Sequence, residues 1–316
     1  MEAKRLRIVA LVLIVPILFS MLAVEAFAAS KFVASRKTIV ISSIADLEAA
    51  ITGQQDGQTW VIRKGRYDLT PNQTIEVGGQ KGWYFPIVAD NLTIIGQGDP
   101  VIYSSFFTPN GNWASQDLIC VFGNNCSISG LTLMPKTEVN KTLEVVGDIN
   151  FTIKDCSFVP NPLVPEDGGC LYINGAEADG KNVIRIYDNY FDYSLIALDG
   201  VSARSVQIVG NTFRHLFANA YAIGNTFWGS ADRLTLQYCD VYVSGNNFRD
   251  VAPGQCIIKA RLNQTFILDT KNRVNGKKIR SKDFQQYVVL GNVVGSRYEN
   301  CKNAEVIVGR RRHGLK

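Results

Sequence analysis

The sequence is poor in histidine and in recognisable cofactor motifs. Only His215 and His313 occur among the 316 residues, and the second lies in the C-terminal tail. A nucleophile activated by histidine would therefore depend on His215 alone. There is no CxxC pair, no phosphate-binding glycine loop and no dinucleotide-binding fingerprint. These absences exclude the common zinc sites and imply no organic cofactor.

Long apolar runs are absent beyond the N-terminus. The single run, Ile8–Val24, has 17 residues, follows Lys4, Arg5 and Arg7, and precedes Ala-Phe-Ala at 26–28. This order predicts a secretory signal peptide over 1–28, followed by one domain over 29–316. An uncleaved anchor is the alternative, because the run is at the short end for a membrane span. We expect a secreted or cell-surface protein with no stable membrane span after cleavage.

Cysteine use does not indicate a disulfide scaffold. All seven cysteines follow residue 28, and in an exported chain their odd number leaves at least one unpaired. Their spacing matches neither a metal site nor a small disulfide-rich fold. We expect buried free thiols, and the sequence leaves any pairing open.

Charge is unevenly distributed along the chain. Residues 29–258 contain 16 Lys/Arg against 22 Asp/Glu, a net charge of −6, whereas residues 259–316 contain 14 against 4, a net charge of +10. In an exported protein, such basic C-terminal coils favour an anionic polysaccharide, an anionic lipid headgroup or an acidic wall polymer as partner. A solvated basic tail, above all at 310–313, explains the same composition. We expect no nucleic-acid partner.

One strand-and-turn unit recurs along the chain, as is typical of a solenoid. It ends at Phe or Val in five segments: Lys154–Phe158, Tyr187–Phe191, Val209–Phe213, Ser244–Phe248 and Leu290–Val294. One slot of the unit is aligned at Leu131, Cys156, Asn189, Asn211, Asn246 and Asn292. Asparagine at a tight bend can take left-handed dihedrals and hydrogen-bond to the asparagine one coil away. The repeat therefore predicts an interior asparagine ladder.

Two further patterns complete the expected solenoid. A second set of short apolar strands follows the phenylalanines, at 170–174, 195–199, 221–223 and 256–261. Strand alternation then leaves one face of each sheet in the core and the other in water. A capping-box pattern begins at Ser43, and the apolar spacing up to Gly53 predicts a helix over 43–52. Such a helix would cover the open end of the solenoid.

These residues carry a family resemblance. The run Thr59–Leu69, the segment Asn91–Gly98 and the Asn-x-Phe units together resemble the right-handed parallel β-helix of the pectin-lyase-like superfamily, over nearly all of 38–309. The resemblance implies an all-β right-handed parallel β-helix with an N-terminal capping helix. It is weak for any single activity, because this fold carries lyases, hydrolases, esterases and non-catalytic surface proteins.

The resemblance also implies where a site would lie. In polysaccharide-active members the substrate lies along the outward face of one sheet, which here is the second strand set, with Asn174, Asp199 and either Lys259 or Arg261. Asp192, Arg214, His215 and Arg249 follow the phenylalanines and would flank that groove. Asp192 and Asp199 would bridge calcium if they fell on adjacent coils. Aromatic residues in long non-repeating stretches, Trp228 among them, would stack on sugars or pack the loops onto the solenoid.

Signatures of the individual enzyme families are missing. There is no adjacent Asp pair with Gly-His-Gly as in polygalacturonase-like hydrolases, and no Arg-x-Pro-x-x-Arg as in pectate lyases. Lys259 and Arg280 are available for a chondroitinase B-like lyase, but no glutamate occurs between 177 and 299 to hold its metal. Whether the protein is an enzyme therefore stays open.

Two hypotheses follow. The first is a polyuronate lyase in which Asp192, Asp199, Lys259, Arg261 and Arg249 supply the acid, base and cation of a β-elimination. The second is a non-catalytic surface or adhesion protein that binds an extracellular polysaccharide along the same face and is anchored by its basic end. The second is favoured, since no acid–base pair is visible in the sequence.

Overall fold

The structure is a computed structural model in which residues Thr38–Lys316 form one compact unit. The predicted signal peptide at 1–28 lies outside the residues that the structure describes. Those residues are 37–69, 75–77, 80–83, 85–104, 117–134, 141–147, 149–160, 162, 169–174, 182–199, 205–216, 221–224, 239–260, 264–280, 283, 286–290 and 305–308.

Three long sheets contain most of the described strands. The first has ten strands, in the order β1 (Thr38–Ile41), β2 (Thr59–Arg63), β7 (Thr93–Gln97), β10 (Cys126–Ser129), β13 (Phe151–Lys154), β16 (Val183–Tyr187), β19 (Ser205–Val209), β22 (Cys239–Ser244), β25 (Gln264–Leu268) and β29 (Glu305–Val308). All neighbouring strands of this sheet pair in parallel. In β22 and β25, for example, Val241 is the partner of Phe266.

The second sheet has nine described strands, from β3 (Arg66–Asp68) through β8 (Val101–Tyr103), β11 (Thr132–Met134), β14 (Ser157–Phe158), β17 (Tyr190–Asp192), β20 (Thr212–Arg214), β23 (Asn247–Arg249) and β26 (Arg273–Val274) to β27 (Lys277–Lys278). The third has eight: β6 (Pro86–Ile87), β9 (Asp117–Val121), β12 (Lys141–Val146), β15 (Cys170–Asn174), β18 (Leu195–Asp199), β21 (Ile223–Gly224), β24 (Ile258–Ala260) and β28 (Val288–Leu290). A separate antiparallel pair joins β4 (Ile75–Val77) to β5 (Gln80–Trp83).

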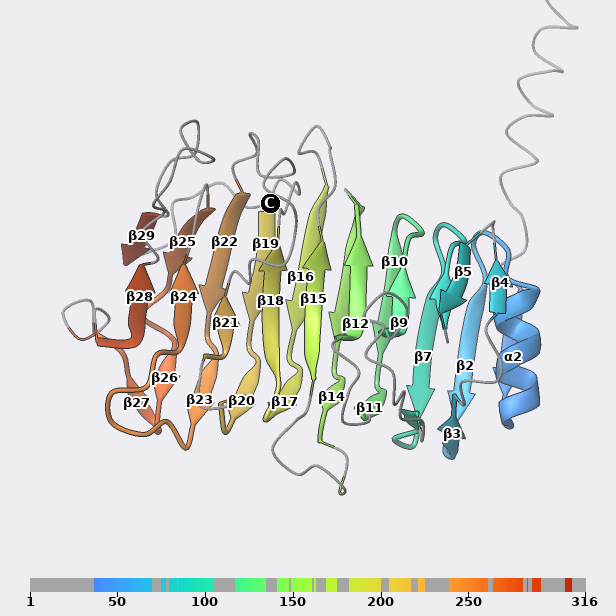
Figure 1. Ribbon diagram of the computed structural model, residues 1–316, viewed down its shortest axis with the longest axis horizontal. Helices are drawn as coiled ribbons and strands as arrows, with labels where there is room; N and C mark the ends of the chain where they lie inside the picture. The colour runs from blue at the N-terminus through green and yellow to red at the C-terminus, as the bar shows by residue number, and fades with distance from the viewer. Residues whose placement is uncertain are drawn as a thin grey trace, which may run out of the picture. The chain divides into compact units, whose positions relative to one another are not determined.

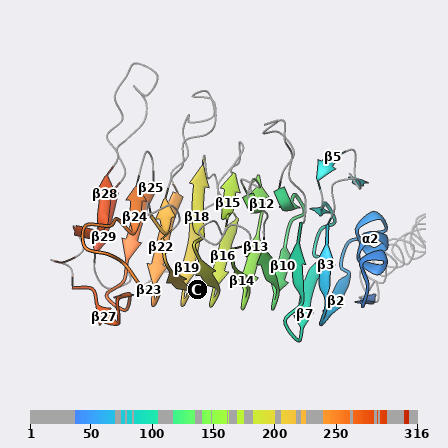
Figure 2. The ribbon, with the colours of Figure 1, turned by 60° about the horizontal axis from the view of Figure 1, so that its bottom comes forward.

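Successive strands of the chain belong to the first, second and third sheet in turn, and this order makes the fold a parallel β-helix. Strands β16, β17 and β18 form one coil, and the next coil, β19, β20 and β21, lies beside it in all three sheets. Figures 1 and 2 both show these coils stacked side by side, with α2 at one end and β28 at the other. The predicted all-β parallel β-helix is confirmed.

Inward-facing side chains fill the narrow core in rows, one residue from each coil. The clearest row is the stack Phe158, Phe191, Phe213 and Phe248, whose successive ring centroids are 4.7, 4.8 and 5.1 Å apart. These spacings match the separation of neighbouring strands, about 4.8 Å. The repeated phenylalanine in the sequence is therefore the core residue of each second-sheet strand.

A row of buried asparagines lies at the bend between the first and second sheets. Asn189 donates from Nδ2 to Oδ1 of Asn211 at 3.1 Å, and Asn211 donates to Asn246 at the same distance. Asn246 donates in turn to Asn272 at 3.1 Å. The sequence alignment placed Asn292 after Asn246, but Asn272 fills that slot, and Asn292 lies outside the described residues.

The left-handed residue of each bend is not the asparagine. It is the residue before the slot: Gly130, Asp155, Asp188, Gly210 and Gly245, with φ between 53° and 73°. The expectation that the asparagines themselves take left-handed dihedrals is wrong. The preceding residue makes the turn, and the asparagine side chain is thereby directed inward, where each amide bonds to the next coil.

The predicted helix at 43–52 is present as α2 (Ile44–Thr52). Ser43 is the N-cap, and its Oγ accepts a hydrogen bond from the Asp46 backbone at 3.1 Å. Leu47, Ala50 and Ile51 are buried. Figure 1 shows the helix beside β2 at the N-terminal end of the stack. Among the described residues, no helix has the length and hydropathy of a membrane span.

The cysteines whose side chains the structure describes have free thiols. Cys120, Cys126, Cys156 and Cys170 are buried, and Cys256 is half-buried. Burial raises the pKa of the Cys156 thiol to about 12 and that of the Cys126 thiol to about 11. These thiols therefore act as small core residues, as the sequence predicted.

Candidate functional site

Three successive coils end their second-sheet strand with a charged residue that faces outward. Strands β17, β20 and β23 place Asp192, Arg214 and Arg249 in direct register. The residue before each is a buried phenylalanine, so strand alternation turns the charged side chains to the outside. A carboxylate and two guanidinium groups therefore form one row across the coils.

The next residue on each coil is also polar or aromatic. Tyr193, His215 and Asp250 follow the three strands, with φ of 48°, 50° and 57°. Left-handed dihedrals cost a residue other than glycine about 1–2 kcal/mol. They persist here at the same corner in consecutive coils, and they bring the three side chains to one edge of the row.

His215 is the centre of these contacts. Its Nδ1 lies 2.8 Å from Oδ1 of Asp192, and its Nε2 lies 3.6 Å from Oδ2 of Asp250. Its ring stacks on Tyr193 with centroids 4.4 Å apart and planes 16° apart. Because an ionised carboxylate only accepts, Nδ1–H is the donor to Asp192.

Arg214 completes the connection between coils. Its Nε donates to Oδ2 of Asp250 at 3.1 Å. The hydrogen bond with the Tyr190 side chain, followed by that with Asp250, raises the pKa of the Arg214 guanidinium above its ordinary value. We name this group the corner cluster: Asp192, Tyr193, Arg214, His215, Arg249 and Asp250.

A pocket of about 490 Å³ opens beside the corner cluster. It is lined by Asn247, Arg249, Asp250, Asn275 and Gly276. With its amide oxygen turned toward Arg249, Asn247 accepts from Nε at 2.9 Å and from Nη2 at 3.2 Å. Asn275 has φ 47° and occupies the corner position that follows β26. The pocket therefore extends the row of corner residues, Tyr193, His215 and Asp250, by one coil to Asn275.

The structure divides the residues that the sequence placed around one groove. Asp192, Arg214, His215 and Arg249 come together on the second sheet, whereas the strands of Asn174, Asp199 and Lys259 belong to the third. Asn174 and Asp199 are in register with each other, and nothing is described of their side chains. Arg261 and Trp228 lie outside the described residues.

The calcium prediction required Asp192 and Asp199 to fall on adjacent coils. They belong instead to one coil, on consecutive strands β17 and β18 of different sheets. The condition is not met, so the prediction loses its basis. Within the described part of the chain, no group of three or more His, Cys, Asp or Glu side chains is arranged to hold a metal ion.

Part of the outward face of the third sheet, where the resemblance implied a groove, is buried. Five of its side chains form a second cluster, separate from the main core: Cys170, Tyr172, Leu195, Ala197 and Tyr221, each at most 8% exposed. Glu144 on the same face is 5% exposed, and Lys141 Nζ lies 2.7 Å from its Oε2. Strand alternation gives the outward direction of these side chains but not their burial.

Sequence reasoning missed Tyr193 and Asp250, as well as Asn247 and Asn275. A signal was present, because three of the repeated phenylalanines are followed by two residues of functional type: Asp-Tyr at 192–193, Arg-His at 214–215 and Arg-Asp at 249–250. Extending the repeat by these two positions would have identified the residues of the corner cluster.

No family model matches the chain, and no curated protein matches it. The solved structures that are similar to the chain include the following two. An alginate lyase from Paenibacillus sp. str. FPU-7 has a TM-score of 0.35 at 13% identity, over 77% of this chain and 96% of that chain. The pectin methylesterase PemA from Erwinia chrysanthemi has a TM-score of 0.40 at 12% identity, over 87% and 94%. These values are too low to carry an argument about function, and the fold rests on the sheet topology.

Proposed function

We propose that this protein is exported and binds an anionic polysaccharide along the outward face of the second sheet, at the corner cluster and the pocket beside it. The observation that carries the proposal is the register of Arg214 and Arg249, which presents two guanidinium groups on adjacent coils beside a pocket of about 490 Å³. Export itself rests on the N-terminal sequence pattern.

The geometry suits a linear, acidic ligand. A planar guanidinium binds a carboxylate through two parallel hydrogen bonds. Arg214 and Arg249 place this donor on two adjacent coils, about 4.8 Å apart, so a chain lying across the strands meets a cation at two successive steps. The side chain of Arg214 is 49% exposed, which leaves part of its donor set accessible to a ligand.

The surrounding charge favours the same ligand. Lys271, Arg273, Lys277, Lys278 and Arg280 are exposed on the coil that follows the corner cluster. A basic field of this kind attracts a polyanion and speeds its association at low salt. These five residues belong to the basic C-terminal segment 259–316, and their charge supports the proposal.

A second candidate function, β-elimination of a polyuronate, is favoured by one observation. Asp192 holds the His215 ring at 2.8 Å, the arrangement that orients a histidine as a general base. Arg249 would neutralise the substrate carboxylate. Binding without catalysis has more support, because His215 Nε2 faces Asp250. Of the five residues in the lyase hypothesis, Asp192 and Arg249 lie on strands of the second sheet and Asp199 and Lys259 on strands of the third. The fifth, Arg261, lies outside the described residues.

Calorimetric titration with polygalacturonate, alginate and a glycosaminoglycan, with and without calcium, tests the proposal. We expect binding of at least one polyanion, weakening steeply with salt, and loss of about tenfold in affinity in Arg214→Gln or Arg249→Gln. Arg66→Gln, which removes an exposed arginine at the other end of the second sheet, is the control. Binding to none of the polymers, or equal loss in the control, overturns it. Ultraviolet absorbance of an unsaturated product would instead establish the lyase.

A further inference from the structure

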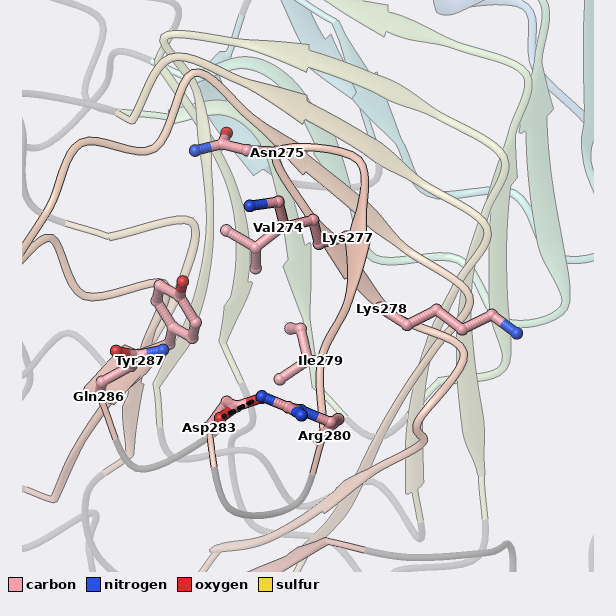
Figure 3. A pocket seen from close by; sticks show the side chains of 9 residues that line it. All are labelled: Val274, Asn275, Lys277, Lys278, Ile279, Arg280, Asp283, Gln286 and Tyr287. Carbon is pink, nitrogen blue, oxygen red and sulfur yellow. Dashed lines mark hydrogen bonds and ion pairs between the residues drawn. The ribbon is translucent and has the colours of Figure 1, made fainter.

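A second pocket, of about 470 Å³, lies at the hairpin formed by β26 and β27. Figure 3 shows its lining, which includes Val274 and Asn275 from one side of the hairpin and Tyr287 from a later segment. Asn275 also lines the pocket beside the corner cluster. The two pockets therefore follow one another along the solenoid.

The pocket has an apolar floor and a polar rim. Val274 is 6% and Ile279 is 3% exposed, and half-buried Tyr287 packs against the main core beside them. In Figure 3 these three side chains border the open space, and Gln286 lies next to Tyr287. A sugar ring is complementary to such a pocket, because its C–H faces are apolar and its edge is polar. Tyrosine can contact both parts, since its ring is apolar and its hydroxyl forms hydrogen bonds.

The cations of the rim differ in their availability. Arg280 Nε donates to Oδ2 of Asp283 at 2.6 Å, and this hydrogen bond raises the pKa of the guanidinium. Lys277 and Lys278 are consecutive strand residues, so their side chains alternate. Figure 3 shows Lys277 on the side of Val274 and Tyr287, and Lys278 extending in the opposite direction. Among the described lining residues, Lys277 thus offers the pocket an ammonium group that no acidic partner occupies.

We infer that this hairpin pocket is a subsite for one sugar ring that bears an anionic group, adjoining the sites at the corner cluster. The ring lies on Val274, Ile279 and Tyr287, and its anionic group binds Lys277. Asn275 lines both pockets, and its amide is held by the Val251 backbone, with Oδ1 accepting from N at 3.1 Å and Nδ2 donating to O at 2.8 Å. The inference rests on the proposed function, since it assigns the pocket to a further unit of the same polymer.

Oligosaccharides of increasing length test the subsite in the full-length protein. The probes are oligogalacturonates from the monomer upward, their methyl esters, and a sulfated oligosaccharide series. For the wild type we expect affinity for oligogalacturonates to rise with length until the chain spans both pockets. Lys277→Gln should lower the affinity for the long oligomers about fivefold and leave the affinity for the short ones unchanged. Tyr287→Leu should have the same effect. Lys64→Gln, which removes an exposed lysine directly after β2 and outside both pockets, should bind as the wild type does.

The outcomes separate the two proposals. If the wild type binds no oligomer, the proposed function fails and the subsite fails with it. If the wild type binds and both pocket variants retain its full length dependence, only the subsite is overturned. Tyr287→Leu carries a risk of misfolding because Tyr287 packs on the core, and Lys277→Gln, at an exposed position, decides the matter alone. If the methyl esters bind as tightly as the acids, the role of Lys277 is overturned. If the sulfated oligosaccharides bind as tightly as the oligogalacturonates, the site accepts anionic sugars in general.

Discussion

Nδ1 of His215 lies 2.8 Å from Oδ1 of Asp192, a residue 23 positions earlier in the chain and one coil away. The pair forms because β17 and β20 are in register and the left-handed corner after β20 turns the imidazole back toward the previous coil. Neither residue marks a site by its sequence neighbours alone.

The His215–Asp192 pair should be energetically coupled. A double-mutant cycle with Asp192→Asn and His215→Asn, measured by urea unfolding, is expected to give a coupling free energy of about 0.5–1.5 kcal/mol. Asparagine at 215 keeps a residue that tolerates left-handed dihedrals, so the cycle reports the contact and not the backbone. Additive effects of the two substitutions would contradict the pair.

Asn211 should be far more sensitive to substitution than the outward-facing, half-buried Asn247. It is fully buried, accepts from the Asn189 backbone at 2.9 Å and donates to Ile186 O at 2.9 Å. Asn211→Leu leaves these groups without partners, so we expect a loss of about 3–5 kcal/mol in unfolding free energy. Asn247→Leu, on the outward face, should cost under about 1 kcal/mol. Equal losses in chemical denaturation would show that the asparagine row does not stabilise the fold.

Gly210 should not tolerate a side chain. It has φ +73°, and an added Cβ would lie 2.1 Å from Oδ1 of Asp188 on the neighbouring coil. Gly210→Ala combines backbone strain with this clash, and a melting experiment should show a loss of about 2–4 kcal/mol. Gly276, with φ +78° and no atom within 4 Å of the added Cβ, is the matched control. Gly276→Ala should cost only the strain, about 1 kcal/mol. A Gly210→Ala variant as stable as the control would refute the close packing of the coils.

Alkaline pH should destabilise the fold through its buried thiols. The pKa of Cys156 is raised from 9.0 to about 12 by burial, so between these values the unfolded chain is deprotonated while the folded chain is not. The folded state then binds more protons, and stability falls as the pH rises above about 9. At pH 10 the loss from this residue is about 1.4 kcal/mol.

The comparison is between wild type and Cys156→Ala, by urea unfolding at pH 7 and pH 10. The variant starts from a lower stability because it leaves a cavity, so the difference between the two pH values is the measured quantity. That difference should be smaller in the variant by about 1.4 kcal/mol. Identical pH dependence would mean that Cys156 is accessible to solvent.

The repeat in the sequence was sufficient for the fold and for part of the site. The phenylalanine and asparagine positions are one-per-coil features, so their recurrence predicted the parallel solenoid and the row at its bend. Asn272 was missed because it follows Lys271 and not glycine, and the alignment took the later pair Gly291-Asn292. Asp192, Arg214, His215 and Arg249 were predicted as flanking residues because they follow the repeated phenylalanine, and these four come together.

Burial on the outward face of the third sheet was not predicted. Glu144 and Tyr172 occupy outward positions by strand alternation, yet both are buried. Alternation determines the direction of a side chain relative to its own sheet, and it carries no information on what covers that sheet. The calcium prediction depended on adjacent coils, and the variable spacing of the repeat hid that Asp192 and Asp199 belong to one coil.

The sequence by itself determined the solenoid, its capping helix and the basic character of its last coils, because each depends on a local pattern repeated or concentrated along the chain. The tertiary structure decided which outward residues meet. Contacts such as His215 with Asp192, or Arg214 with Asp250, depend on the register between coils and on left-handed corners of the backbone, and variable loop lengths hide that register from any fixed spacing in the sequence.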